Sequence, residues 1–159
     1  MFNGGQITEF EQNGNVFYIR PVEPFTSLKL LGDLQKLVSP VIGNVISSFS
    51  DTNNADIGAI DKSIDMGAVE KAFAALAEHV DGEKLEKMCV RILDKNYVSV
   101  SIDGGETVRL GQAQVNELFT GNVSDMLLLI VEVLKVNYGD FMNLFGNLTG
   151  KVGALKRTK

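Results

Sequence analysis

Apolar residues along the chain follow two spacings, and each spacing predicts a different kind of element. Alternation with a period of two residues predicts β-strands at Ile7–Glu11, Val16–Arg20, Val98–Ile102 and Val108–Leu110. Asn13-Gly14 joins the first two strands and suits a tight turn, because both residues adopt positive φ at low cost. A Gly-Gly pair separates the other two strands. The pattern therefore predicts two β-hairpins, one at the N-terminus and one in the middle of the chain.

Six further segments carry apolar residues three or four positions apart, which predicts helices. These segments are residues 26–38, 41–49, 69–80, 85–92, 112–119 and 124–145. Pro40 separates the first two, so we expect a helix–kink–helix arm there. Asp81-Gly82 separates the next two, with Asp81 as the N-cap, and predicts an antiparallel helical hairpin. The expected fold class is α+β, a mostly helical single domain with two β-hairpins and a long apolar C-terminal helix.

Two segments lack the apolar residues that a core needs. Asp51–Asp65 contains four aspartates and few apolar residues, which predicts a mobile acidic loop. The order of its aspartates does not match the ligand spacing of a calcium-binding loop. Lys151–Lys159 has four basic residues and no acidic one, which predicts a flexible basic tail. We therefore expect one domain at residues 1–150, followed by this tail.

The last predicted helix is apolar in nearly every direction around its axis, so it is either buried on all sides or binds another protein. If one face packs on the body of the domain, the inward stripe comprises Leu127, Ile130, Leu134, Tyr138 and Phe141. A second stripe, Leu129, Val133 and Val136, is then left for a partner or for a second copy of the chain. We predict these three as partner-binding residues.

Charge and hydropathy narrow the class of protein. The 159 residues include 15 basic and 20 acidic ones, for a net charge of −5. A nucleic-acid-binding protein is expected to present a basic surface, so this balance argues against that class. The longest apolar run, Met126–Val131, has six residues, whereas a membrane-spanning helix needs about 20. The N-terminus shows no secretory signal. We expect a cytoplasmic protein with neither nucleic acid nor membrane as a partner.

The chain offers little of the chemistry that an enzyme needs. Cys89 is its single cysteine and His79 its single histidine, which excludes intramolecular disulfides and thiolate-rich or two-histidine metal sites. Cys89 lies on an apolar helical stripe, where a buried small hydrophobic residue is expected. No glycine-rich phosphate-binding loop or nucleophile elbow is found. We therefore predict no catalytic residue, no metal site and no cofactor.

The order of these elements, together with two short motifs, is similar to that of a known family. The motifs are Phe119-x-Gly121 and Asn137-Tyr138-x-x-Phe141, and Pro40-Val41 lies inside the predicted arm. From Val22 to Phe145 the chain resembles the tail assembly chaperones encoded by long-tailed bacteriophages.

That resemblance implies a non-enzymatic, late-expressed protein of the host bacterial cytoplasm. Members of the family bind the tape measure protein, keep its long apolar helices soluble, help recruit tail tube subunits, and are absent from the mature virion. Many are also made in a longer form by ribosomal frameshifting. The alternative hypothesis is a structural tail completion or connector subunit of the particle, which forms a homo-oligomer through the same helices.

Overall fold

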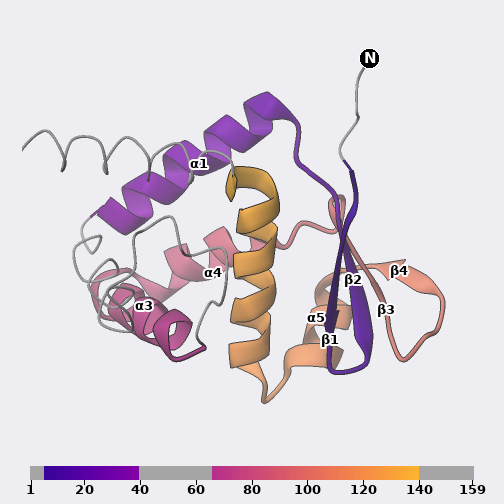
Figure 1. The fold of residues 1–159 in the computed structure, drawn as a ribbon. Helices are drawn as coiled ribbons and strands as arrows, with labels where there is room; N and C mark the ends of the chain where they lie inside the picture. Colours follow the sequence, from indigo (N-terminus) through magenta and orange to yellow (C-terminus); the bar gives the residue numbers. More distant parts are fainter. Residues whose placement is uncertain (1–5, 40–65, 140–159) are drawn as a thin grey trace, which may run out of the picture.

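The computed structural model describes residues 6–39 and 66–139. Its elements are β1 (Thr8–Gln12), β2 (Asn15–Ile19), α1 (Pro24–Val38), α3 (Met66–His79), α4 (Gly82–Ile92), β3 (Val98–Ser101), β4 (Thr107–Arg109) and α5 (Gln112–Phe119) (Figure 1). A further helix covers residues 123–139 and is drawn from orange to yellow. The predicted mixed α+β class is confirmed.

The two predicted hairpins are both present and join into one sheet. Its strand order is β1-β2-β3-β4, and every neighbouring pair is antiparallel. Asn13 and Gly14 have φ values of 53° and 79°, as the predicted tight turn requires. The ends of each strand lie within one residue of their predicted positions. The contact between β2 and β3, which the pattern did not predict, makes the hairpins a single four-stranded sheet.

The 123–139 helix is the central element of the hydrophobic core. In Figure 1 it stands between the sheet with α5 on one side and α1, α3 and α4 on the other. Its buried Leu129, Ile130 and Val133 share one core cluster with Phe17 of β2 and Ile92 of α4. Burial of each such side chain stabilises the fold by roughly 1.5–3 kcal/mol. The helix thus links the two halves of the structure.

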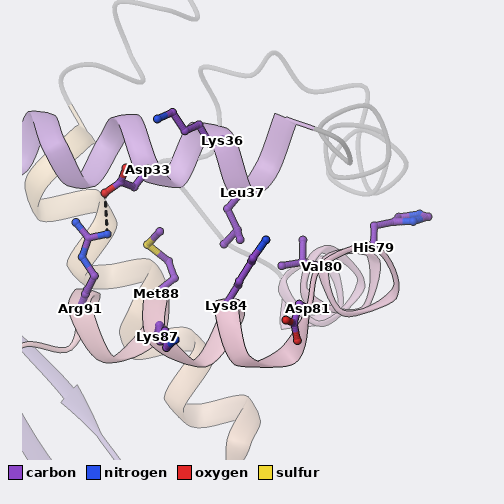
Figure 2. A pocket seen from close by; sticks show the side chains of 10 residues that line it. All are labelled: Asp33, Lys36, Leu37, His79, Val80, Asp81, Lys84, Lys87, Met88 and Arg91. Atoms are coloured by element: carbon purple, nitrogen blue, oxygen red, sulfur yellow. Dashed lines mark hydrogen bonds and ion pairs between the residues drawn. The ribbon is translucent and has the colours of Figure 1, made fainter.

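The predicted N-cap of α4 is confirmed, but the predicted packing of α3 and α4 is wrong. The Asp81 carboxylate accepts a hydrogen bond from the Glu83 backbone N–H at 3.1 Å. Figure 2 looks along α3 while α4 runs across the view, so the two helices cross instead of lying antiparallel. The reason lies in the core, because α4 places Met88 and Ile92 in the main cluster around the 123–139 helix.

Several predictions fall on residues outside the described part of the chain. These are the second helix of the arm (41–49), the acidic segment Asp51–Asp65, the last residues of the C-terminal helix and the basic tail Lys151–Lys159. The single domain at residues 1–150 therefore stays a prediction. Within residues 6–39 and 66–139, no helix is long and apolar enough to cross a membrane.

Candidate partner-binding surfaces

The three residues predicted to bind a partner lie in or against the core. Leu129 is 0% exposed and Val133 is 2% exposed, while Val136 is half-buried and packs against the same cluster. The expectation that this stripe faces outward is therefore wrong for Leu129 and Val133. The physical reason is the central position of the helix, which packs on both sides. A role of these residues in binding stays a prediction that would require the helix to leave the core.

Asn137 and Tyr138, two residues of the second motif, lie at the end of the 123–139 helix and form hydrogen bonds with residues at the start of α1. The backbone N–H of Val22 donates to Asn137 Oδ1 at 2.8 Å, and Asn137 Nδ2 donates to the Val133 carbonyl at 2.9 Å. The Tyr138 hydroxyl donates to the Ser27 carbonyl at 2.8 Å. Asn137 and Tyr138 thus fix the position of α1, which the sequence motif alone did not indicate.

A second contact at the start of α1 involves Glu23, its N-cap residue. The Glu23 carboxylate accepts a hydrogen bond from the Tyr97 hydroxyl, which belongs to the segment just before β3. This bond lowers the pKa of Glu23 from its ordinary value, and Arg20 nearby acts in the same direction. The same bond raises the pKa of Tyr97. The first turn of α1 therefore has hydrogen bonds to the segment before β3 and to the 123–139 helix.

Helix α1 has two different apolar faces. Leu30 is buried, and Leu34 and Leu37 pack against the core from the same side. On the other side, Phe25 is 87% exposed and Leu28 is 62% exposed. Phe25 and Leu28 are three positions apart, so they are neighbours on the helix surface. We call this pair the outer strip of α1.

The outer strip differs from the other exposed apolar side chains of the described residues. Those are Ile7, Val90, Val108 and Val123, and each lies on a different element or segment. Single exposed apolar residues are normal on protein surfaces, whereas contiguous exposed apolar patches are typical of interaction sites. The first helix of the predicted arm therefore presents two neighbouring exposed apolar side chains.

A groove of about 380 Å³ lies between α1, the end of α3 and α4 (Figure 2). Leu37, Val80 and Met88 supply its apolar part, and Lys84 reaches from α4 toward α1 between them. At one end Arg91 forms an ion pair with Asp33 at 2.9 Å. The sequence pattern did not indicate this groove, because it depends on how α1 and α4 pack.

Among the described residues, neither the single cysteine nor the single histidine belongs to a group of side chains that could hold a metal ion. Cys89 is half-buried against the core, and burial raises the pKa of its thiol. His79 is exposed at the end of α3, where it is one of the residues that border the groove (Figure 2). Across residues 6–39 and 66–139, no three His, Cys, Asp or Glu side chains are grouped so as to hold a metal ion.

Comparison with known protein families gives a match over most of the chain. Residues 13–149 match the family described as phage tail assembly chaperone protein. No curated protein and no solved structure matches the chain. The matched range includes every element from β2 to the 123–139 helix, as well as the two motifs that carry the resemblance. Since it also covers most of the sequence, the chain belongs to the phage tail assembly chaperone family.

Proposed function

We propose that this protein is a non-enzymatic chaperone that binds the tape measure protein of a phage tail and helps to recruit tail tube subunits. It acts in the cytoplasm of the host bacterium and leaves before the virion is complete. Membership of the tail assembly chaperone family supports this proposal. The structural observation that carries it is the outer strip of α1, where Phe25 and Leu28 are exposed side by side.

The outer strip is suited to hold another helix. Before assembly, a long helical protein exposes apolar stripes that need a temporary partner. Apolar side chains three positions apart on α1 can pack along such a stripe, as in other helix-to-helix recognition. An exposed aromatic residue such as Phe25 is a typical anchor, because it buries a large area when bound.

Co-expression with the tape measure protein, followed by affinity purification, tests the site. The double variant Phe25→Asp/Leu28→Asp should recover roughly tenfold less tape measure protein than wild type, because it places two charges in the contact. Val123→Asp is the matched control, since Val123 is 58% exposed at the start of the 123–139 helix, while α1 is bonded to the other end of that helix. Both variants should melt near the wild-type temperature. Normal recovery by a folded double variant would place the site elsewhere.

A second measurement separates this function from a structural role in the particle. Mass spectrometry of purified virions should find tape measure and tail tube proteins but not this chain. Its presence at a fixed copy number per particle would support a tail completion or connector subunit instead.

A further inference from the structure

The middle of α1 contains a glycine that the fold itself does not require. Gly32 lies in the interior of the helix Pro24–Val38 and has helical backbone, unlike Gly14, whose φ of 79° favours glycine. A methyl group on Gly32 would have nothing within 4 Å apart from its own helix. Other residues would therefore fit at this position, and most would stabilise the helix, because only proline is a weaker helix former than glycine.

Gly32 lies on the same face of α1 as the outer strip. It follows Phe25 and Leu28 at the spacings of seven and four residues that place neighbours along one side of a helix. The exposed Lys36 comes one turn after it on the same side, and the buried Leu30 lies on the opposite side. Gly32 thus forms a gap in the outer face of α1, between the outer strip and Lys36.

The charged side chains of this face are both basic. Lys29 and Lys36 are exposed, and no ion pair of the described residues includes either of them. Asp33, the only acidic residue of α1, is already paired with Arg91 of α4 at 2.9 Å. The outer face therefore keeps two unpaired positive charges, which favour a ligand that carries carboxylates.

We propose that a helix of the protein held by this chaperone crosses α1 at Gly32 and carries carboxylates beside its apolar stripe. The proposal rests on the proposed function and adds the point of contact and the charge of the ligand. Packed helices lie about 8–10 Å apart, depending on the side chains at the contact. The missing side chain of Gly32 permits the closer approach, at which the ligand covers more of Phe25 and Leu28.

A second copy of the chain suits this face less well than such a ligand. Two outer faces packed together would bring Lys29 and Lys36 of both copies into one contact. The only carboxylate of α1, on Asp33, is already paired and could not neutralise them. Like charges in one contact disfavour a complex, whereas an acidic helix can pair with both lysines.

Two substitutions of Gly32 in the full-length protein separate stability from binding. Gly32→Ala and Gly32→Gln should both raise the melting temperature by roughly 2–5 °C, because both residues form helices better than glycine. The ligand is a fluorescently labelled peptide of about 18 residues, with leucine at helical spacing and glutamate elsewhere. Fluorescence anisotropy should show binding roughly tenfold weaker for Gly32→Gln, whose side chain fills the crossing point, and within about twofold of wild type for Gly32→Ala.

A double variant tests the charge of the ligand. Lys29→Gln/Lys36→Gln should bind the glutamate peptide roughly fivefold more weakly, because two exposed ion pairs are lost. Glutamine forms helices about as well as lysine, so the variant should fold normally. Lys71→Gln/Arg109→Gln, on α3 and β4, removes the same charge elsewhere and should bind as wild type. A peptide with lysine in place of glutamate should bind wild type much more weakly.

Several results would overturn the proposal. The first is equal binding of the glutamate peptide to wild type and to Gly32→Gln, or no binding to wild type. A lower melting temperature of Gly32→Ala would show that the fold requires the glycine. A dimer that sedimentation detects in wild type but not in Gly32→Gln would assign the face to a second copy. Tighter peptide binding after the aspartates of residues 51–65 are changed to asparagine would assign it to that segment.

Recovery of the tape measure protein distinguishes this inference from the proposed function. If wild type recovers none but binds the glutamate peptide through Gly32, the proposed function fails and the crossing at Gly32 stands. If Gly32→Gln recovers as much as wild type while Phe25→Asp/Leu28→Asp does not, the proposed function stands and the crossing at Gly32 is rejected.

Discussion

At the scale of single residues, the Glu23–Tyr97 hydrogen bond makes the stability of the fold depend on the protonation of both side chains. The bond lowers the folded-state pKa of Glu23, so its contribution to stability is present above the ordinary carboxyl range and is lost as pH falls through the folded pKa. The bond raises the pKa of Tyr97, so that contribution is lost only as pH rises through the folded value. At pH values between these two ranges, the hydrogen bond makes its full contribution to the stability of the fold.

Removal of the Tyr97 hydroxyl should therefore raise the pKa of Glu23 toward its ordinary value near 4.5. NMR titration of the side-chain carboxyl carbons in wild type and in Tyr97→Phe measures this shift. The pKa should stay somewhat below the ordinary value, because a backbone hydrogen bond to the carboxylate and the charge of Arg20 still lower it. Carboxyls distant from position 97 serve as the control and should show the same midpoints in both proteins. An unchanged Glu23 midpoint would mean that the bond does not form in solution.

Cys89 should react slowly with thiol reagents in the folded protein. The thiol is half-buried against the core and burial raises its pKa, so little of the reactive thiolate is present near neutral pH. Reaction with a disulfide reagent such as dithionitrobenzoate at pH 8 measures the rate. The rate should rise strongly in urea, when the core opens. A folded-state rate equal to that in urea would contradict this placement.

At the scale of elements, the position of α1 depends on the end of the 123–139 helix. Tyr138→Phe keeps the buried ring but removes the hydrogen bond to the Ser27 carbonyl, so it should lower the free energy of unfolding by about 1 kcal/mol. Tyr18→Phe is the matched control, since the Tyr18 hydroxyl has no hydrogen-bond partner among the described residues. Urea unfolding of both variants measures the difference. Equal stability of the two variants would show that the Tyr138 bond contributes nothing.

The elements themselves were largely predictable from local patterns, whereas their contacts were not. Asn13-Gly14 and the period-two residues predict the first hairpin because turn and strand preferences act within a few residues. The pairing of Phe17 with Val100 joins positions more than 80 residues apart, and no local pattern encodes it. The crossing of α3 and α4 and the groove beside Lys84 arise in the same way, from packing. Leu28 was predicted as part of a helical arm, but the exposure of Phe25 and Leu28 is visible only once Leu30 is placed in the core.

At the scale of the whole molecule, the elements on each side of the last helix decide whether its apolar residues are buried in the core or exposed for a partner. A sequence that is apolar all round is compatible with full burial or with a binding face. Here the sheet occupies one side and α1 and α4 the other, so Leu129 and Val133, from the stripe predicted to face outward, are buried as well as Ile130, from the stripe predicted to face inward. The stability of the fold should therefore depend on residues that the pattern assigned to partner binding.

Val133→Glu tests this conclusion. It places a carboxylate at a site that is 2% exposed, where a charge without a partner costs several kcal/mol. We expect a loss of about 3–5 kcal/mol in the free energy of unfolding, measured by urea denaturation followed by circular dichroism. Val90→Glu is the matched control, since Val90 is 66% exposed on α4 and its change should cost less than about 0.5 kcal/mol. If Val133→Glu melts like wild type and recovers less tape measure protein, the 123–139 helix leaves the core to bind its partner, and the originally predicted stripe is the site.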